Sequence, residues 1–154
     1  MNYALRAIKS AQGEETPCFS ATITLDGVDI GSVRNTGTGG NCFWYWKDHL
    51  VGETFYRWIK ANTTESFEPE DDWAYQHLDA FDNLKIYMRK SLKKTLFAID
   101  ADISTGEYRE LSTPDSLKAR AWILAKYTAQ HPKVFDRTTK TWVAITPIAV
   151  KAAA

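Results

Sequence analysis

The dipeptide Asp26-Gly27 constrains the fold of this chain most, because it separates two segments that alternate apolar and polar residues. Over residues 17–25 the alternation is that of a half-buried β-strand. Asp-Gly tolerates positive φ at both centres of a two-residue primed turn, so we expect residues 28–34 to return as a second strand. The register that continues from this turn puts Phe19 opposite Arg34.

A glycine-rich turn, Asn-Thr-Gly-Thr-Gly-Gly-Asn, follows at residues 35–41. Gly37, Gly39 and Gly40 permit backbone conformations that are closed to residues with a Cβ atom. One hypothesis is a binding turn, in which successive N–H groups hold an anion or a partner's carboxylate and Asn35 acts as a side-chain clamp. The other is a structural corner in which Asn35 satisfies backbone groups, and glycine turns of that kind are commoner. No phosphate-loop or dinucleotide-binding pattern is present, so nucleotide binding has no motif support.

A longer pattern covers the first quarter of the chain. It reads Glu15-Thr16-x-x-Phe19-x-Ala21, then Asp26-Gly27, then Asn35-x-Gly37-x-Gly39-Gly40. This pattern resembles a group of small uncharacterised proteins from phages, plasmids and bacterial genomes, and residues 95–108 fit the same layout more loosely. The resemblance implies a mobile-element setting and no particular activity. Thr36 and Thr38 stand where acidic, histidine or other polar residues are commoner in such turns, which argues against a metal or acid–base role.

Composition narrows the classes of partner. The 154 residues carry zero formal net charge, so there is no global electrostatic basis for attraction to nucleic acid or to an anionic membrane. Six Trp, seven Tyr and seven Phe make the chain rich in aromatic side chains, which dominate protein interfaces. Two cysteines and no signal segment predict free thiols and a cytoplasmic location in the host cell. No run approaches the ~18 apolar residues of a membrane span, so we expect no membrane partner.

The pattern of apolar residues predicts an α+β fold. Strands are expected at residues 2–9, 42–46, 95–100, 107–111, 134–136 and 141–145, and helices at 48–62, from 69 to about 94, and from 113 to about 130. Asp48 and Thr113 are the expected helix caps, and residues 100–106 are expected to form a hairpin loop. We predict one domain over residues 1–150, an antiparallel sheet built from hairpins with about three helices packed on one face. Two separate sheets are the alternative, and residues 151–154 are interpreted as a tail of cloning origin.

Two further groups of side chains are candidate surfaces. Trp44 and Trp46 belong to an aromatic run that fits a buried core with an interface ring, or a stacking platform for bases or a partner's side chains. Four cations end the long helix: Arg89, Lys90, Lys93 and Lys94. They complement the helix dipole, and they could also form a patch that contacts phosphates or an acidic protein surface.

No catalytic constellation can be assembled from the sequence, and we expect neither a metal nor a cofactor. The three histidines lie on different predicted elements, and neither cysteine has a context that lowers a thiol pKa. The chain is therefore predicted to be a cytoplasmic binding protein of a phage or mobile element that occupies a host macromolecule, most simply a host protein, with counter-defence as one purpose. Two alternatives stay open: a binder or enzyme for a phosphorylated small ligand that uses the glycine turn, and a nucleic-acid-binding accessory protein that uses the four cations.

Overall fold

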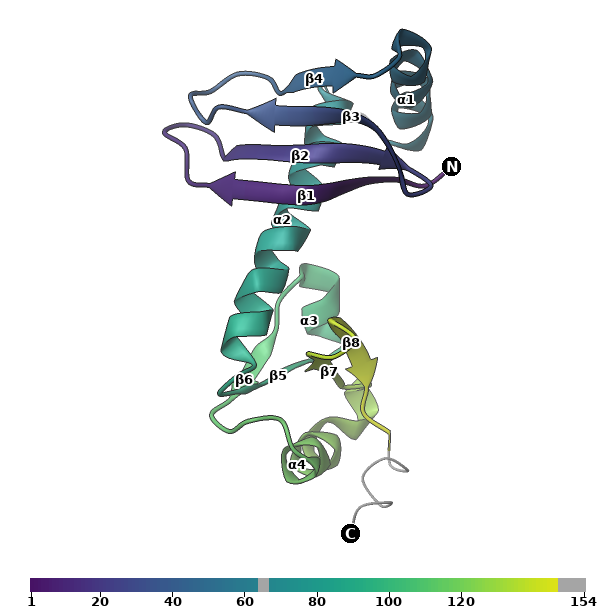
Figure 1. Ribbon diagram of the computed structural model, residues 1–154. Helices are drawn as coiled ribbons and strands as arrows, with labels where there is room; N and C mark the ends of the chain where they lie inside the picture. The colour runs from purple at the N-terminus through teal and green to yellow at the C-terminus, as the bar shows by residue number, and fades with distance from the viewer. Residues whose placement is uncertain (64–66, 147–154) are drawn as a thin grey trace. The chain divides into compact units, whose positions relative to one another are not determined.

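The computed structural model describes residues 1–63 and 67–146 and has an α+β fold (Figure 1). The described residues form two four-stranded antiparallel sheets, the alternative that the sequence left open. The chain divides into two compact units, residues 1–82 and 83–154. The prediction that residues 1–150 form one domain is not tested by this division. The predicted tail, residues 151–154, lies outside the described residues. Among the described residues, no helix is long and apolar enough to cross a membrane.

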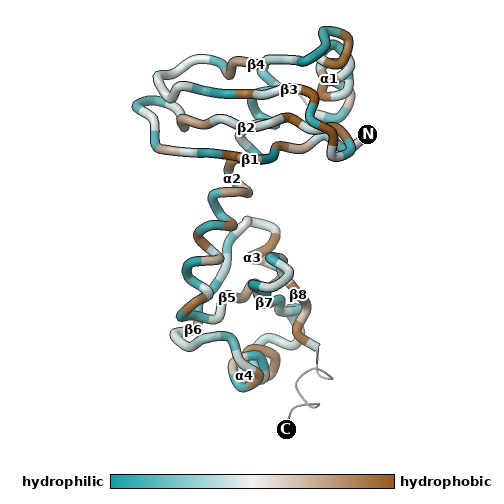
Figure 2. Tube along the Cα trace, in the orientation of Figure 1, coloured by the Kyte–Doolittle hydropathy of each residue, from teal (hydrophilic) through white to brown (hydrophobic). Residues whose placement is uncertain are grey.

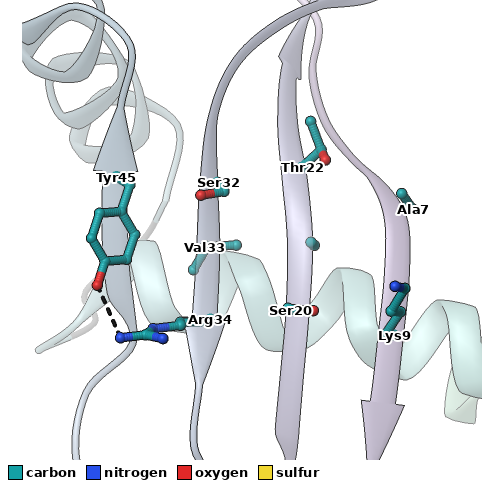
Figure 3. Close-up of a pocket in the computed structure, with 9 residues that line it drawn as sticks. Ala7, Lys9, Ser20, Thr22, Ser32, Val33, Arg34 and Tyr45 are labelled. Carbon is teal, nitrogen blue, oxygen red and sulfur yellow. Dashed lines mark hydrogen bonds between the residues drawn. The ribbon is translucent and has the colours of Figure 1, made fainter.

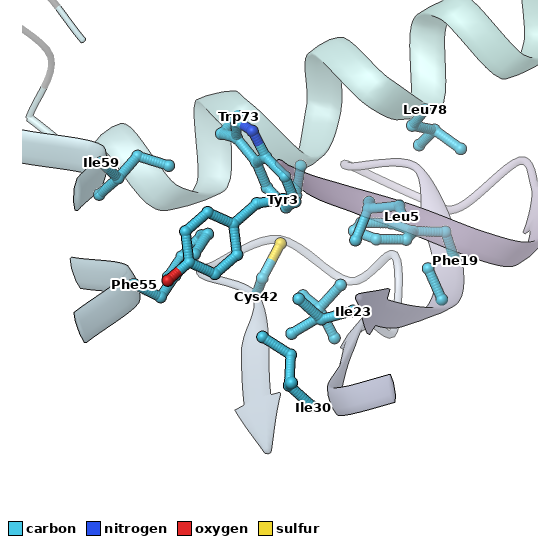
Figure 4. Close-up of a cluster of buried hydrophobic side chains, with 13 residues drawn as sticks. Tyr3, Leu5, Phe19, Ile23, Ile30, Cys42, Phe55, Ile59, Trp73 and Leu78 are labelled. Carbon is cyan, nitrogen blue, oxygen red and sulfur yellow. The ribbon is translucent and has the colours of Figure 1, made fainter. Parts of the chain in front are cut away.

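The first unit is a sheet in the order β1-β2-β3-β4 with helices on one face. Its elements are β1 (Tyr3–Ala11), β2 (Cys18–Leu25), β3 (Val28–Asn35), β4 (Phe43–Trp46), α1 (His49–Asn62) and the first part of α2 (Pro69–Lys90). Between sheet and helices lies a core in which Ile23, Phe55 and Ile59 are fully buried (Figure 4). Trp73 and Leu78 of α2 close the same core.

The β2–β3 hairpin turns at Asp26 and Gly27 as predicted, with φ of 49° and 88°. Its predicted register is wrong beyond the first residues. Ile30 is an extra residue in β3, because Thr24 pairs with Asp29 whereas Ile23 pairs with Gly31. Phe19 consequently lies opposite Asn35 and not Arg34. This bulge turns Arg34 to the face of the sheet away from the core.

Strand β1 contains a second bulge. Arg6 pairs with Thr22 and Lys9 pairs with Ser20, so three steps along β1 match two steps along β2. Ala7 takes up the extra residue with a φ of 50°, in the left-handed region that residues with a Cβ rarely adopt. Arg6 and Lys9, three apart in sequence, therefore emerge on the same face of the sheet.

The helices of this unit begin where the sequence indicates. Asp48 caps α1 and accepts a hydrogen bond from the backbone N–H of Leu50 at 2.7 Å. Helix α2 starts at Pro69 with three acids in its first turn and ends with Arg89 and Lys90 in its last. The prediction that it continues to about residue 94 is wrong, because Lys93 and Lys94 follow the end of the helix. Its residues are largely hydrophilic, with hydrophobic bands spaced along it (Figure 2).

The second unit has the sheet order β6-β5-β7-β8. It comprises the last part of α2, then β5 (Thr95–Ala98), α3 (Asp100–Thr105), β6 (Arg109–Leu111), α4 (Leu117–Tyr127), a 3-10 turn (Thr128–Gln130), β7 (Lys133–Asp136) and β8 (Thr141–Ala144). Its core joins Phe97, Val134 and Ile145 to Ile123 of α4.

Two predictions in this unit are wrong. The expected hairpin loop at residues 100–106 is the short helix α3, which ends at Gly106 in the left-handed conformation. The carboxylate of Asp102 stabilises its start, because it accepts the N–H of Ile99 at 3.1 Å. The cap of α4 is Ser116, whose hydroxyl accepts the N–H of Ala119, and not Thr113.

Candidate functional site

The face of the first sheet that lies opposite α1 and α2, which we call the open face, carries two aligned rows of charged, hydroxyl-bearing and aromatic side chains. The register places Lys9, Ser20, Arg34 and Phe43 in one row, and Arg6, Thr22, Ser32 and Tyr45 in the next. Adjacent strands lie ~4.8 Å apart, so each row extends about 14 Å from β1 to β4. Each row thus has a cation on β1, a hydroxyl on β2 and an aromatic ring on β4.

Arg34 is held in place by the rings of β4. Its guanidinium lies 5.6 Å from the ring centre of Phe43 and 5.5 Å from that of Tyr45. It also donates a hydrogen bond of 3.1 Å to the Tyr45 hydroxyl (Figure 3). Phe43 and Tyr45 are each 50% exposed, so the cation–π contact orders the arginine and still leaves both residues accessible.

Two adjoining hollows run along the open face. One, of about 450 Å³, is lined by small side chains, among them Ala7, Ser20 and Ser32, with Lys9 and Arg34 beside them (Figure 3). The second, of about 410 Å³, shares Lys9, Ser20 and Arg34 with the first. Because these side chains are small, the surface is hollowed between the cations of β1 and the aromatic rings of β4.

The charge of the open face is positive. The four strands contain four charged residues, the three cations Arg6, Lys9 and Arg34 and the single acid Asp29. Asp29 pairs with Thr24, two residues along β2 from Thr22, so it lies on the same face in the row next to that of Arg6 and leaves the face a net charge of +2. Within the rows there is no carboxylate, imidazole or thiol, the groups that ligate metals. Guanidinium, ammonium and hydroxyl groups without acids are the chemistry of anion binding.

The side-chain carboxamide of Asn35, in the glycine turn, forms hydrogen bonds with other residues of the first unit. Its oxygen accepts hydrogen bonds from the N–H of Gly37 at 2.8 Å and the hydroxyl of Thr16 at 2.9 Å. Its nitrogen donates to the carbonyl of Gly40 and to the hydroxyl of Tyr75, each at 3.1 Å. The side chain is only 2% exposed. These bonds are those of a structural corner, and a binding role for the turn stays a prediction.

Backbone conformation and close packing explain why this turn contains glycines. Gly37, Gly39 and Gly40 have φ of 81°, 84° and 83°. At Gly37 a Cβ would also lie 2.7 Å from the Cα of Gly13, because the preceding loop packs directly against the turn. The carbonyl of Gly37 accepts the N–H of Glu14 at 2.7 Å, which joins the loop to the turn. Close backbone packing therefore accounts for part of the glycine content.

A buried polar group that the sequence did not indicate fixes β4. Asp71 of α2, 4% exposed, accepts the N–H of Cys42 at 2.6 Å and the indole N–H of Trp44 at 2.9 Å. Burial and the nearby Asp71 charge raise the pKa of the Cys42 thiol to about 12. Burial and the neighbouring Cys42 likewise raise the pKa of Tyr75 to about 12. A thiol with such a pKa is inert as a nucleophile near neutral pH.

Trp44 and Trp46 point toward the helices. Their rings stack on each other at 5.9 Å, and both lie against Phe55 of α1. Both are partly buried and pack against the core. Their assignment to a partner surface stays a prediction, while the most exposed rings of β4 are those of Phe43 and Tyr45.

The four predicted cations of the second unit are partly engaged. Lys90 donates hydrogen bonds of 2.7 Å to the Tyr108 hydroxyl and to the Glu110 carboxylate. Lys94 pairs with the same carboxylate. These two bonds to Glu110 hold its pKa below the usual value. Two of the four cations, Lys90 and Lys94, therefore share their charge with Glu110. A binding role for the patch that they form with Arg89 and Lys93 stays a prediction.

Sequence reasoning missed the open face because it depends on the two bulges. With regular strands Arg34 would have faced the core, and Arg6 and Lys9 would have pointed to opposite faces. The alternation within β4 was a usable signal, since packing of Trp44 and Trp46 on the core requires Phe43 and Tyr45 to face outward.

Comparison with known proteins gives no relative. No protein-family model, no curated protein and no solved structure matches this chain. The likeness of residues 15–40 to small phage and plasmid proteins therefore stays a resemblance, and function is inferred from the geometry of the chain itself.

Proposed function

We propose that this protein is a binding protein that acts by occupying a macromolecule through the open face of its first sheet. The proposed setting is a phage or other mobile element in its host cell, with counter-defence as the purpose. The motif over residues 15–40 supports that setting. The open face supports the mode of action.

The observation that carries the proposal is the alignment of the two rows. Side chains from four strands converge on a face about 14 Å across, with cations at one edge and half-exposed rings at the other. Aromatic and arginine side chains are the residues that contribute most to binding at interfaces. The hollows between them are open and shallow, and they suit an extended surface better than an enclosed small molecule.

The glycine turn gives less support to a phosphorylated small ligand. All the bonding groups of the Asn35 side chain have partners within the unit, and Gly37 donates its N–H to that side chain. An anion at the turn would have to displace these bonds, at a cost of about 1 kcal/mol for each.

The test is affinity co-purification from bacterial lysate with three proteins. These are the wild type, the open-face variant Arg34→Ala/Tyr45→Ala, and the control variant Arg57→Ala/Leu50→Ala, whose two side chains are exposed on α1. Retained proteins are identified by mass spectrometry and retained nucleic acid by sequencing. We expect the wild type and the control to retain one macromolecule at comparable molar amount, and the open-face variant to lose it. Identical material on all three proteins would contradict the proposal.

A further inference from the structure

We infer that the macromolecule bound by the open face is single-stranded nucleic acid, with Phe43 and Tyr45 stacking on bases and Arg6, Lys9 and Arg34 contacting phosphates. This inference rests on the proposed function and names the chemical class of its partner. The basic patch predicted from the sequence lies elsewhere, in the second unit, and has no part in it.

The first argument is the combination of groups. Proteins that bind single strands combine cations that follow the phosphate backbone with aromatic rings on which bases stack. The open face has both, and they occur in the same two cross-strand rows. Arg34, ordered between Phe43 and Tyr45, places a cation next to the stacking rings. One nucleotide could then stack its base on an aromatic ring while its phosphate contacts the guanidinium of Arg34.

The second argument is the backbone strain in β1. A residue with a Cβ in the left-handed region costs ~1–2 kcal/mol, and Ala7 has a φ of 50°. The same bulge brings Arg6 and Lys9 onto the open face beside Thr22 and Ser20. Bulges recur where a side chain has to be re-aimed at a functional site. Here the strained residue places a second cation of β1 on the face that carries the rings, in addition to Arg34 of β3.

The third argument separates a single strand from other partners. The faces of bases in a duplex are covered by their neighbours, so exposed rings on a sheet have nothing to stack on unless the strand is open. An acidic protein surface would pair with the three cations, but it offers no series of flat rings to stack on Phe43 and Tyr45, as successive bases of a single strand do. The hydroxyls of Ser20, Thr22 and Ser32 between the edges can accept and donate hydrogen bonds to any base or sugar.

The experiment is fluorescence anisotropy of fluorescein-labelled dT12 and U12, with unlabelled 12-base-pair duplex as a competitor, from 50 to 300 mM salt. Three phosphate contacts predict a slope of about −2 for the logarithm of the association constant against the logarithm of salt concentration. Phe43→Ala should weaken binding by about five- to 150-fold, because one stacked base is lost. Tyr45→Phe keeps the ring but loses the hydrogen bond to Arg34, so it should weaken binding less than Phe43→Ala does.

Matched variants distinguish the loss of a phosphate contact from the loss of folded structure. Arg34→Ala and Lys9→Ala should each reduce the salt slope by about 0.7, whereas Arg57→Ala on α1 should leave both slope and affinity unchanged. Circular dichroism checks that each variant is folded, and all the substituted side chains are exposed.

Three results would overturn the inference: no binding of dT12 or U12 at 100 μM protein, affinity unchanged by Phe43→Ala and Arg34→Ala, or equal competition by duplex. If a protein from lysate is retained through the open face while the oligonucleotides do not bind, the inference fails and the proposed function stands. If neither binds, both fail.

Discussion

Replacing Asn35 by alanine should strongly destabilise the first unit. The substitution removes hydrogen bonds to Gly37, Thr16, Gly40 and Tyr75, all on a side chain that is 2% exposed. At about 1 kcal/mol for each bond the free energy of unfolding falls by about 4 kcal/mol. With a urea dependence of about 1.5 kcal/mol per molar, the midpoint of unfolding moves down by about 2.7 M.

The assay is equilibrium urea unfolding followed by tryptophan fluorescence, since Trp44, Trp46 and Trp73 pack within this unit. Two companion variants keep the measurement informative if the alanine variant does not fold. Tyr75→Phe loses one bond of the network and should lower the midpoint by about 0.7 M. Thr36→Ala changes an exposed neighbour and should shift it by less than about 0.3 M. A midpoint for Asn35→Ala within 0.5 M of the wild type would refute the structural account of the turn.

Three other predictions concern stability. Ala7→Gly should raise the free energy of unfolding by about 0.5–1 kcal/mol in urea unfolding, because glycine adopts a φ of 50° without strain; a loss would contradict the bulge. Tyr3→Phe should raise it by about 1 kcal/mol, since the buried Tyr3 hydroxyl has no hydrogen-bond partner among the described residues, and a lower midpoint would indicate a partner. The folded pKa of Cys42 is about 12 against an ordinary 9.0, so its protonated thiol favours the folded state fully below pH 9, and that stability is lost as pH rises toward 12. Urea unfolding at pH 8 and 10.5 should show the decrease, and Cys42→Ala should make it smaller; an equal decrease in both proteins would exclude the thiol as its cause.

Local chemistry made much of the fold predictable. Asp26-Gly27 sets its own turn because both residues tolerate positive φ, and Asp48 caps α1 because a short carboxylate reaches the free N–H groups of the first turn. The α+β class follows from apolar spacing in the same way. Each of these signals depends on residues that are neighbours in the sequence.

The candidate site was not predictable because it depends on pairing between strands. The extra residues at Ala7 and Ile30 leave no mark in a short window of sequence, yet they decide which face Arg6, Lys9 and Arg34 occupy. Asp71 illustrates the same limit. At the start of α2 it fits a favourable charge near the helix dipole, whereas in the fold it bonds to Cys42 and Trp44 from β4.

The bulge at Ala7 also bears on how the protein behaves at high concentration. Strand β1 lies at one edge of its sheet, and an uninterrupted edge is a template onto which another molecule can add a strand. The kink at Ala7 breaks the run of backbone groups that such an addition needs, and Arg6 and Lys9 flank it with charges of the same sign. The distortion that places Arg6 and Lys9 on the open face thereby also makes β1 a poor template for strand addition by another molecule.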